Sequence, residues 1–245
     1  MRAPLLGIYA LGAEWQALID PATESGVAHL KLAWWQEEMQ RLGAGSPVHP
    51  ISVYLAGLPR AAAVDFNPLL AAVTAAAGHV GGVPLERGAD LAPQSRALWG
   101  GPLALASRLG AEVSDEAGLQ SCTTALAAAH YLSGALRNYR RDARAGRVPF
   151  AIDELLAARI DNDALLAEPP PPHLESYLGV VRERAADCFK SAAQALPRAE
   201  RRPHRHLLVL AALGLTHLNS RAPALPRRGF KDMLLAWRTA RSANR

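Results

Sequence analysis

The stretch that decides the fold is Leu136-Arg137-Asn138-Tyr139-Arg140-Arg141-Asp142-Ala143-Arg144-Ala145-Gly146-Arg147. We expect it to end a long helix that Ser114 or Asp115 caps and that reaches about Arg144. On a helix, residues four apart lie on the same face about one turn apart, so Asn138 and Asp142 should point at one cavity. Oxygen-bearing side chains and a dense group of arginines are therefore predicted at the same helix end.

The remainder of the chain also predicts helices. Its 245 residues, 50% of them hydrophobic, can bury a large core as one domain. Most of the apolar content is Ala and Leu, and aromatic residues make up only 6%, which favours helices over sheets. No stretch alternates convincingly with period two, so we expect a single all-α domain over residues 1–245. Helices are expected at about 5–17 (closed by Pro21), 25–42, 51–58, 67–77, 93–109, 114–144, 153–160, 173–196, 204–220 and 230–243, with a turn or break at 78–84 and a stiff connection at 169–172.

The net charge is +5, and arginine supplies most of the positive charge. Arginine binds phosphate bidentately, which suits an anionic partner, although a solvated arginine-rich surface explains the charge equally well. No nucleic-acid-binding motif accompanies it, so no nucleic-acid partner is expected. Cys122 and Cys188 match no metal or redox spacing. The N-terminus has no signal-peptide pattern, and the apolar run at 207–218 is too short to cross a bilayer, so we expect a cytoplasmic protein.

A second stretch near the N-terminus repeats the pattern of an amide four residues before a carboxylate. It reads Tyr9-Ala10-Leu11-Gly12-Ala13-Glu14-Trp15-Gln16-Ala17-Leu18-Ile19-Asp20. Mg²⁺ demands hard oxygen ligands and often shares its shell with substrate phosphates. Two facing helices that carry such oxygens can hold Mg²⁺ ions against one diphosphate.

The two stretches resemble the aspartate-rich motifs of the squalene/phytoene synthase family, L-R-D-x-x-x-D-x-R-x-G-R and Y-A-F-C-R-E-x-D-D-x-x-D. The resemblance implies an isoprenoid-synthase-type helical bundle around a central cavity, where Mg²⁺ promotes head-to-head joining of two prenyl diphosphates. The segment Leu32–Glu38, followed by His49-Pro50, resembles the family's W-W-R-x-E helix. This form, together with the closing segment 236–241, looks most like the degenerate bacterial branch related to a mitochondrial assembly factor for respiratory complex I.

The departures from the family pattern follow one rule. Each motif keeps its second acid and carries an amide in place of the first, while Ala13 replaces an arginine expected to reach phosphate. By the resemblance, the catalytic candidates are Tyr9, Asp20 and Asp142; the candidate weak Mg²⁺ ligands are Asp20, Asp142 and Asn138; and the substrate-binding candidates are Arg137, Arg140, Arg141, Arg147, Gln16 and Asn138.

Two carboxylates where four are expected should hold Mg²⁺ weakly or not at all, and Arg140 and Arg141 could replace the metals as phosphate counterions. We therefore expect a protein that is weak or inactive as a prenyltransferase. It would bind a prenyl diphosphate or related lipid, or assist assembly of a respiratory complex with peripheral contact at the inner membrane.

Three alternatives stay open. The chain could be an active Mg²⁺-dependent head-to-head prenyltransferase, or a scaffold whose cavity is filled by side chains. The arginines could also be only a solvated basic helix end favoured by the helix dipole, with Asp20 as a helix-terminus residue.

Overall fold

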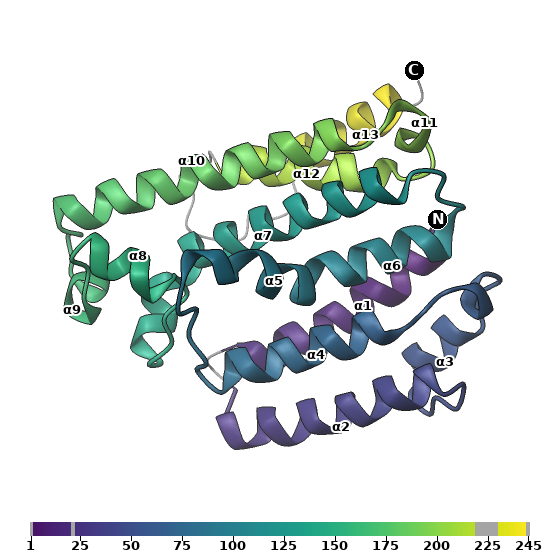
Figure 1. Cartoon of the computed structure of the whole chain (residues 1–245), viewed down its shortest axis with the longest axis horizontal. Coiled ribbons are helices and arrows are strands. Elements are labelled where there is room, and N and C mark those ends of the chain that lie inside the picture. The colour runs from purple at the N-terminus through teal and green to yellow at the C-terminus, as the bar shows by residue number, and fades with distance from the viewer. Residues whose placement is uncertain (1, 21–22, 219–229, 244–245) are drawn as a thin grey trace.

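The computed structural model describes residues 2–20, 23–218 and 230–243, and all regular secondary structure in these ranges is helical (Figure 1). The all-α prediction is confirmed. Among the described residues, no helix is both long and apolar enough to span a bilayer. The α-helices are α1 Arg2–Ile19, α2 Ser25–Gly43, α3 Pro50–Ala56, α4 Asn67–Val80, α5 Leu91–Ser95, α6 Gly101–Gly110, α7 Glu116–Arg144, α8 Ile152–Ala157, α9 Asn162–Leu166, α10 Pro172–Ala195, α11 Arg198–Arg201, α12 Arg205–Leu218 and α13 Phe230–Ser242, with the short helices η1 Ala61–Ala63, η2 Gly88–Asp90 and η3 Arg96–Gly100.

The long helices run alongside one another in layers (Figure 1). Helix α2 packs on α4, and α1 lies against α3, α4 and α6. On the other side, α7 packs along α10, while α12 lies between α10 and α13. Separate groups of buried side chains fill these layers, one among α1–α4 and α6, another where α7 meets α8–α10, and a third where α7 meets α10 and α12. The site lies between α1 and α7.

The long helix α7 has clear signals at both ends. The Asp115 carboxylate accepts a hydrogen bond from the backbone N–H of Gly118 at 2.9 Å, which confirms the predicted cap. At the other end Gly146 has φ +72°, a left-handed conformation that glycine adopts at little cost. The backbone N–H of Arg147 then donates to the Asp142 carbonyl at 2.9 Å. This turn folds Arg147 back toward the helix end.

The structure differs from the predicted helices in several places. The helix expected at 93–109 is continuous over residues 91–110, but its middle is the π-helix η3. The short helices α9 and α11 were not predicted, and α4 runs on to Val80 before a turn in which Gly82 has φ +71°. Ser220, the predicted end of the helix from 204, lies outside the described residues, as does Pro21.

The tryptophan pair on α2 holds the loop that leads to α3. Trp35 is buried against His49, with ring centroids 4.6 Å apart, whereas Trp34 is 40% exposed. The buried Glu38 carboxylate accepts hydrogen bonds from the backbone N–H groups of Val48 and His49 at 3.0 and 2.8 Å. Burial by itself would raise the pKa of Glu38, but these bonds and the one from Arg41 lower it. Trp35 and Glu38 therefore have a packing role in this segment.

Candidate functional site

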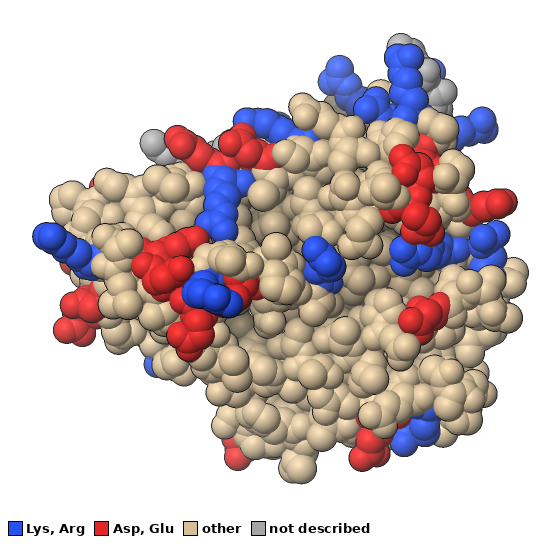
Figure 2. All heavy atoms as spheres, in the orientation of Figure 1, with Lys and Arg blue, Asp and Glu red and all other residues tan. Residues whose placement is uncertain are grey.

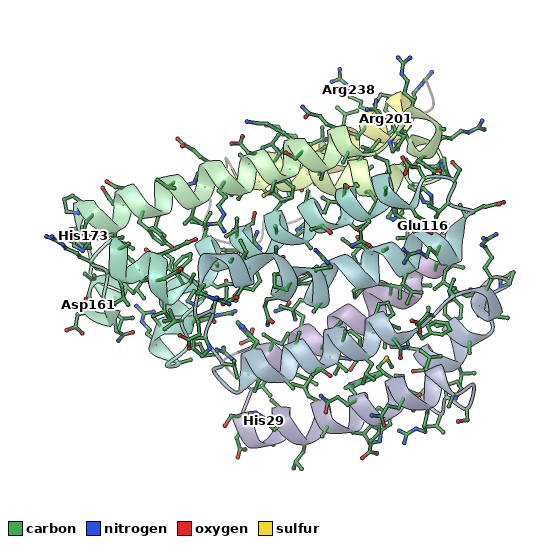
Figure 3. All side chains as sticks on the ribbon, viewed as in Figure 1. His29, Glu116, Asp161, His173, Arg201 and Arg238 are labelled. Atoms are coloured by element: carbon green, nitrogen blue, oxygen red, sulfur yellow. The ribbon has the colours of Figure 1, made fainter. Side chains whose placement is uncertain are left out.

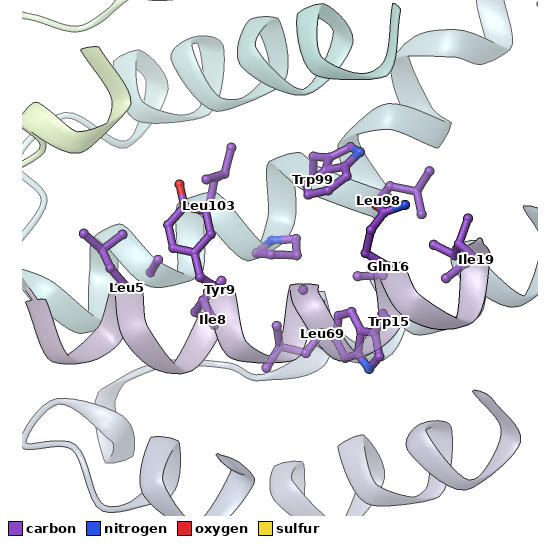
Figure 4. A pocket seen from close by; sticks show the side chains of 15 residues that line it. Leu5, Ile8, Tyr9, Trp15, Gln16, Ile19, Leu69, Leu98, Trp99 and Leu103 are labelled. Atoms are coloured by element: carbon purple, nitrogen blue, oxygen red, sulfur yellow. The ribbon is translucent and has the colours of Figure 1, made fainter. Parts of the chain in front are cut away.

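Two adjoining cavities lie along α1, and the empty space assigned to each is about 660 Å³, counting the part open to solvent. The apolar cavity lies among α1, α4, η3 and α6 (Figure 4). The polar cavity lies between the C-terminal ends of α1 and α7. Both are lined by Gln16, Ile19, Leu98 and Trp99.

One face of α1 supplies the first set of site residues. Tyr9, Gly12, Gln16 and Ile19 are spaced three or four apart, so a helix brings them to one side. Figure 4 shows Tyr9 and Gln16 rising from this face into the apolar cavity. Asp20 directly follows α1 and does not line either cavity.

One face of α7 supplies the opposite wall of the polar cavity. Tyr131, Gly134, Asn138 and Asp142 line it at the same helical spacing, and Arg141 joins them. The predicted convergence of Gln16 from α1 with Asn138 and Asp142 from α7 on one cavity is therefore observed. The two motifs are more than 100 residues apart in sequence but form one site.

Each retained acid lies against an arginine from the second motif. The Arg141 guanidinium is 3.2 Å from the Asp20 carboxylate, and both side chains are nearly half exposed. Arg147 is 3.4 Å from Asp142, and about nine-tenths of both side chains is buried. Arg147 also donates to the Ile19 carbonyl at 3.1 Å. The Arg141–Asp20 contact thus joins the two motifs, and Arg147 ties the end of α1 to the end of α7 through the Ile19 carbonyl.

The other arginines of this helix end lie outside the cavities. Arg140 donates to the Glu168 carboxylate at 2.7 Å and to the Ala167 carbonyl at 3.0 Å, and Arg144 lies 3.9 Å from Glu168. Arg137 is exposed. Successive residues on a helix are about 100° apart, so Arg140 points nearly opposite to Asn138. Phosphate binding by Arg137 and Arg140 stays a prediction, and it would require a ligand that reaches beyond the polar cavity.

The acids present do not fit the metal cluster that the family resemblance implies. Among residues 2–20, 23–218 and 230–243, no three His, Cys, Asp or Glu side chains are grouped to hold a metal ion. Asp20 and Asp142 are both in contact with a guanidinium, and the neighbouring positions carry the neutral amides Gln16 and Asn138. Mg²⁺ prefers anionic oxygens, so this set offers it little charge.

Three titratable side chains that line the polar cavity are neutral, namely those of His79, His130 and Tyr131. Burial, with a smaller contribution from Arg137, lowers the pKa of His130 to about 4, and the ring Nε2 is buried without a hydrogen-bond partner. Burial also lowers the pKa of His79, and raises that of Tyr131 to about 12. All three side chains are uncharged at neutral pH.

Some of these lining residues were missed by sequence reasoning. Trp99 and Leu98 enter both cavities from the π-helix, a local irregularity that is frequent at functional sites and that helical periodicity does not reveal. His130 is a third such residue. It contacts Phe189 edge-on at 5.4 Å, but it also lines the polar cavity, as its spacing from Gly134 and Asn138 could have indicated.

The comparisons with known proteins agree with this geometry. The squalene/phytoene synthase family model matches residues 1–242. The chain belongs to the squalene/phytoene synthase family. A comparison with curated proteins finds no similar sequence.

Two solved structures show the same fold as this squalene/phytoene synthase family member. A dehydrosqualene synthase in complex with a ligand has TM-score 0.79 and 13% identity, covering 100% of this chain and 88% of that one. The squalene synthase HpnC from Alicyclobacillus acidocaldarius has TM-score 0.71 and 18% identity, covering 89% and 81%. The predicted isoprenoid-synthase-type bundle is confirmed. The polar cavity between the motif helices is open, whereas the alternative of a scaffold predicts a cavity filled by side chains.

Proposed function

We propose that this squalene/phytoene synthase family member binds a prenyl diphosphate or a related anionic lipid and is weak or inactive as a head-to-head prenyltransferase. One observation carries the proposal. The second acid of each Asp-rich motif, Asp20 and Asp142, lies against an arginine of the second motif. Arginine side chains therefore supply part of the positive charge that metal ions would otherwise supply.

The two cavities suit the two ends of such a ligand. The apolar cavity can enclose a prenyl chain, which gains free energy by leaving water. At the polar cavity the Arg141 side chain is about half exposed, so a phosphate can replace Asp20 as its partner. The phosphate can then accept hydrogen bonds from two N–H groups of the guanidinium. The amide N–H groups of Gln16 and Asn138 are further donors to phosphate oxygens.

The same residues are poor at promoting ionisation. Departure of diphosphate from an allylic carbon requires strong neutralisation of the leaving group, which bound metal ions supply in metal-dependent transferases. Here the Arg147 charge is already balanced by Asp142, and Arg141 is balanced by Asp20 until a ligand arrives. Binding can therefore persist where turnover is slow.

The deciding experiment is a thermal shift with farnesyl and geranylgeranyl diphosphate, with and without Mg²⁺. Ligand that binds the native state raises the melting temperature by mass action. We expect a rise that does not depend on Mg²⁺ and that shrinks in Arg141→Gln. Arg144→Gln, outside the cavity, is the matched control. A rise that needs Mg²⁺ would reject the arginine-held site, and no rise would reject prenyl-lipid binding.

An active Mg²⁺-dependent prenyltransferase is the second candidate, because Tyr9 and Asp142 still line the cavities. It predicts a head-to-head condensation product from farnesyl or geranylgeranyl diphosphate with Mg²⁺, detected by mass spectrometry and lost in Asp142→Ala. Absence of any product under conditions where ligand binds would reject this candidate.

The branch assignment is a further part of the proposal. The segments 32–38 and 236–241 resemble the degenerate bacterial branch, which implies a respiratory-complex assembly partner. Native-gel analysis of complex I after deletion of the gene tests this role. Loss of assembled complex that is restored by the wild-type gene is expected, and unchanged assembly would reject it.

A further inference from the structure

Helix α13 exposes three large apolar side chains on its outer face. Met233, Leu234 and Trp237 are 66%, 41% and 56% exposed. The opposite side of α13 packs on α12, where Leu235, Ala236 and Thr239 are partly buried. The exposed apolar groups are therefore not needed to hold α13 in place.

Basic residues share the same face. Lys231, Arg238 and Arg241 are all exposed, and the Arg241 guanidinium lies 5.2 Å from the centre of the Trp237 ring. At 100° per residue, these three cations and the three apolar side chains occupy one arc of about 160°. Figure 3 shows Arg238 pointing away from the bundle. The face combines apolar area with positive charge.

Acidic residues are turned away from this face. Asp232, the acid of α13, lies 3.0 Å from His217 on α12 and is only partly exposed. Helix α12 has no acidic residue in its sequence. In the sequence from 219 to the end there are seven Lys or Arg residues and one acid. Figure 2 shows Lys and Arg atoms gathered at the corner where the C-terminal end of α13 lies.

The exposed apolar stripe on α2 provides a contrast. Val27, Leu30 and Trp34 are 38%, 75% and 40% exposed, but they are flanked by exposed acids, Glu24 just before α2 and Glu37 on it. That stripe therefore lacks the uniform positive charge that would attract anionic lipid headgroups.

We propose that α13 docks on the anionic surface of a phospholipid bilayer. Met233, Leu234 and Trp237 enter the boundary between headgroups and acyl chains, as the apolar face of an interfacial amphipathic helix does. Lys231, Arg238 and Arg241 contact lipid phosphates at the rim of the same face. A nucleic acid would use the charge but not the apolar groups, which favours the bilayer. This surface is separate from the cavities and does not depend on the ligand that they hold.

The test is co-sedimentation of the full chain with phosphatidylglycerol vesicles and with phosphatidylcholine vesicles. We expect binding to phosphatidylglycerol only, weakened about tenfold or more in Arg238→Gln/Arg241→Gln, because each basic residue near the surface contributes to attraction. Met233→Ser/Trp237→Ala should also weaken binding although its charge is unchanged. The control Arg87→Gln/Arg159→Gln removes the same charge beside α8 and should bind as wild type.

Equal loss in the control would overturn the proposal, since it would show attraction by net charge alone. So would full binding by Met233→Ser/Trp237→Ala, tighter binding to duplex DNA than to vesicles, or a dimer in ultracentrifugation that dissociates in this variant. Circular dichroism of each variant confirms folding. The thermal shift with prenyl diphosphates should be unchanged in the α13 variants, which separates this result from that of the cavity proposal.

Discussion

The buried ion pair between Arg147 and Asp142 lies beside the candidate site and also contributes to the stability of the fold. Their side chains are about nine-tenths buried, and Arg147 also reaches the Ile19 carbonyl on α1. Removing one partner of a buried pair leaves an uncompensated charge, which costs far more than losing an exposed pair. The G-R at the end of the second motif thus has a structural role as well as a place beside the cavity.

Replacement of Arg147 should therefore lower the free energy of unfolding strongly. We expect Arg147→Met to lower the free energy of unfolding by about 3–5 kcal/mol, because Asp142 is left buried without its counterion. Arg144→Met, which breaks a surface pair with Glu168, should cost less than about 1 kcal/mol. Urea unfolding measures both. Recovery of much of the loss in Arg147→Met/Asp142→Asn is expected, and equal losses in the two single variants would contradict the buried pairing.

The side-chain amides of Gln16 and Asn138 give a second prediction about single residues. Gln16→Asp/Asn138→Asp restores two negative charges to the polar cavity, so Mg²⁺ should bind more tightly, as measured by calorimetric titration. Gln40→Asp/Asn162→Asp adds the same charge at exposed positions and should leave Mg²⁺ affinity unchanged. If the cavity variant gains no Mg²⁺ affinity, the assignment of these positions to a former metal site is incorrect.

At the scale of single elements, α7 positions the site through the way it ends. Gly146 takes a left-handed conformation, and nothing would meet a Cβ at this position within 4 Å, so the cost of a side chain is one of backbone strain alone. The turn returns Arg147 to Asp142. An unusual backbone conformation at one glycine is thereby coupled to an ion pair.

Two glycine-to-alanine changes should consequently have opposite signs. Gly146→Ala should destabilise by roughly 1–2 kcal/mol because the left-handed conformation is unfavourable for alanine. Gly179→Ala, in the interior of α10 with free space around it, should stabilise by about 0.5–1 kcal/mol. Chemical unfolding of both variants provides the comparison, and Gly146→Asn should lose less than Gly146→Ala. Stabilisation by both alanines would show that position 146 does not hold a left-handed turn in solution.

At the scale of the whole molecule, buried neutral histidines link stability to pH. Burial lowers the pKa of His130 to about 4 and that of His206, beside His204, to about 3. Unfolding exposes both rings and returns their pKa values to about 6.5. Below pH 6.5 the unfolded chain therefore binds protons that the folded chain does not, and stability must fall with pH.

The melting temperature should accordingly decrease as pH falls from about 6.5 toward 4. His130→Leu should flatten this dependence, because it removes one of the histidines whose pKa is lowered by burial. His173→Gln, at an exposed position, should not. Thermal unfolding across this pH range measures the slopes. A wild-type melting temperature that stays constant from pH 6.5 to 4 would show that the two rings do not titrate as their burial requires.

The sequence by itself determined the helical class, the Asp115 cap and the pairing of two motifs in one cavity. These follow from helical periodicity, capping chemistry and motif spacing, which act over a few residues. The same periodicity would also have placed Arg140 away from Asn138, had it been applied to each arginine in turn. The branch and the level of activity are matters for the experiments above.

Only the tertiary structure decided which charges meet. Asp20 and Arg141 are 121 positions apart, and Ile19 and Arg147 are 128 positions apart. Their contacts depend on where the packing of all the helices places the C-terminal ends of α1 and α7. The π-helix that turns Trp99 into both cavities, and the burial that keeps His130 neutral, are likewise products of packing. Local rules fix which face a side chain takes, but the partner on that face is set by long-range packing, which buries apolar area without regard to distance along the chain.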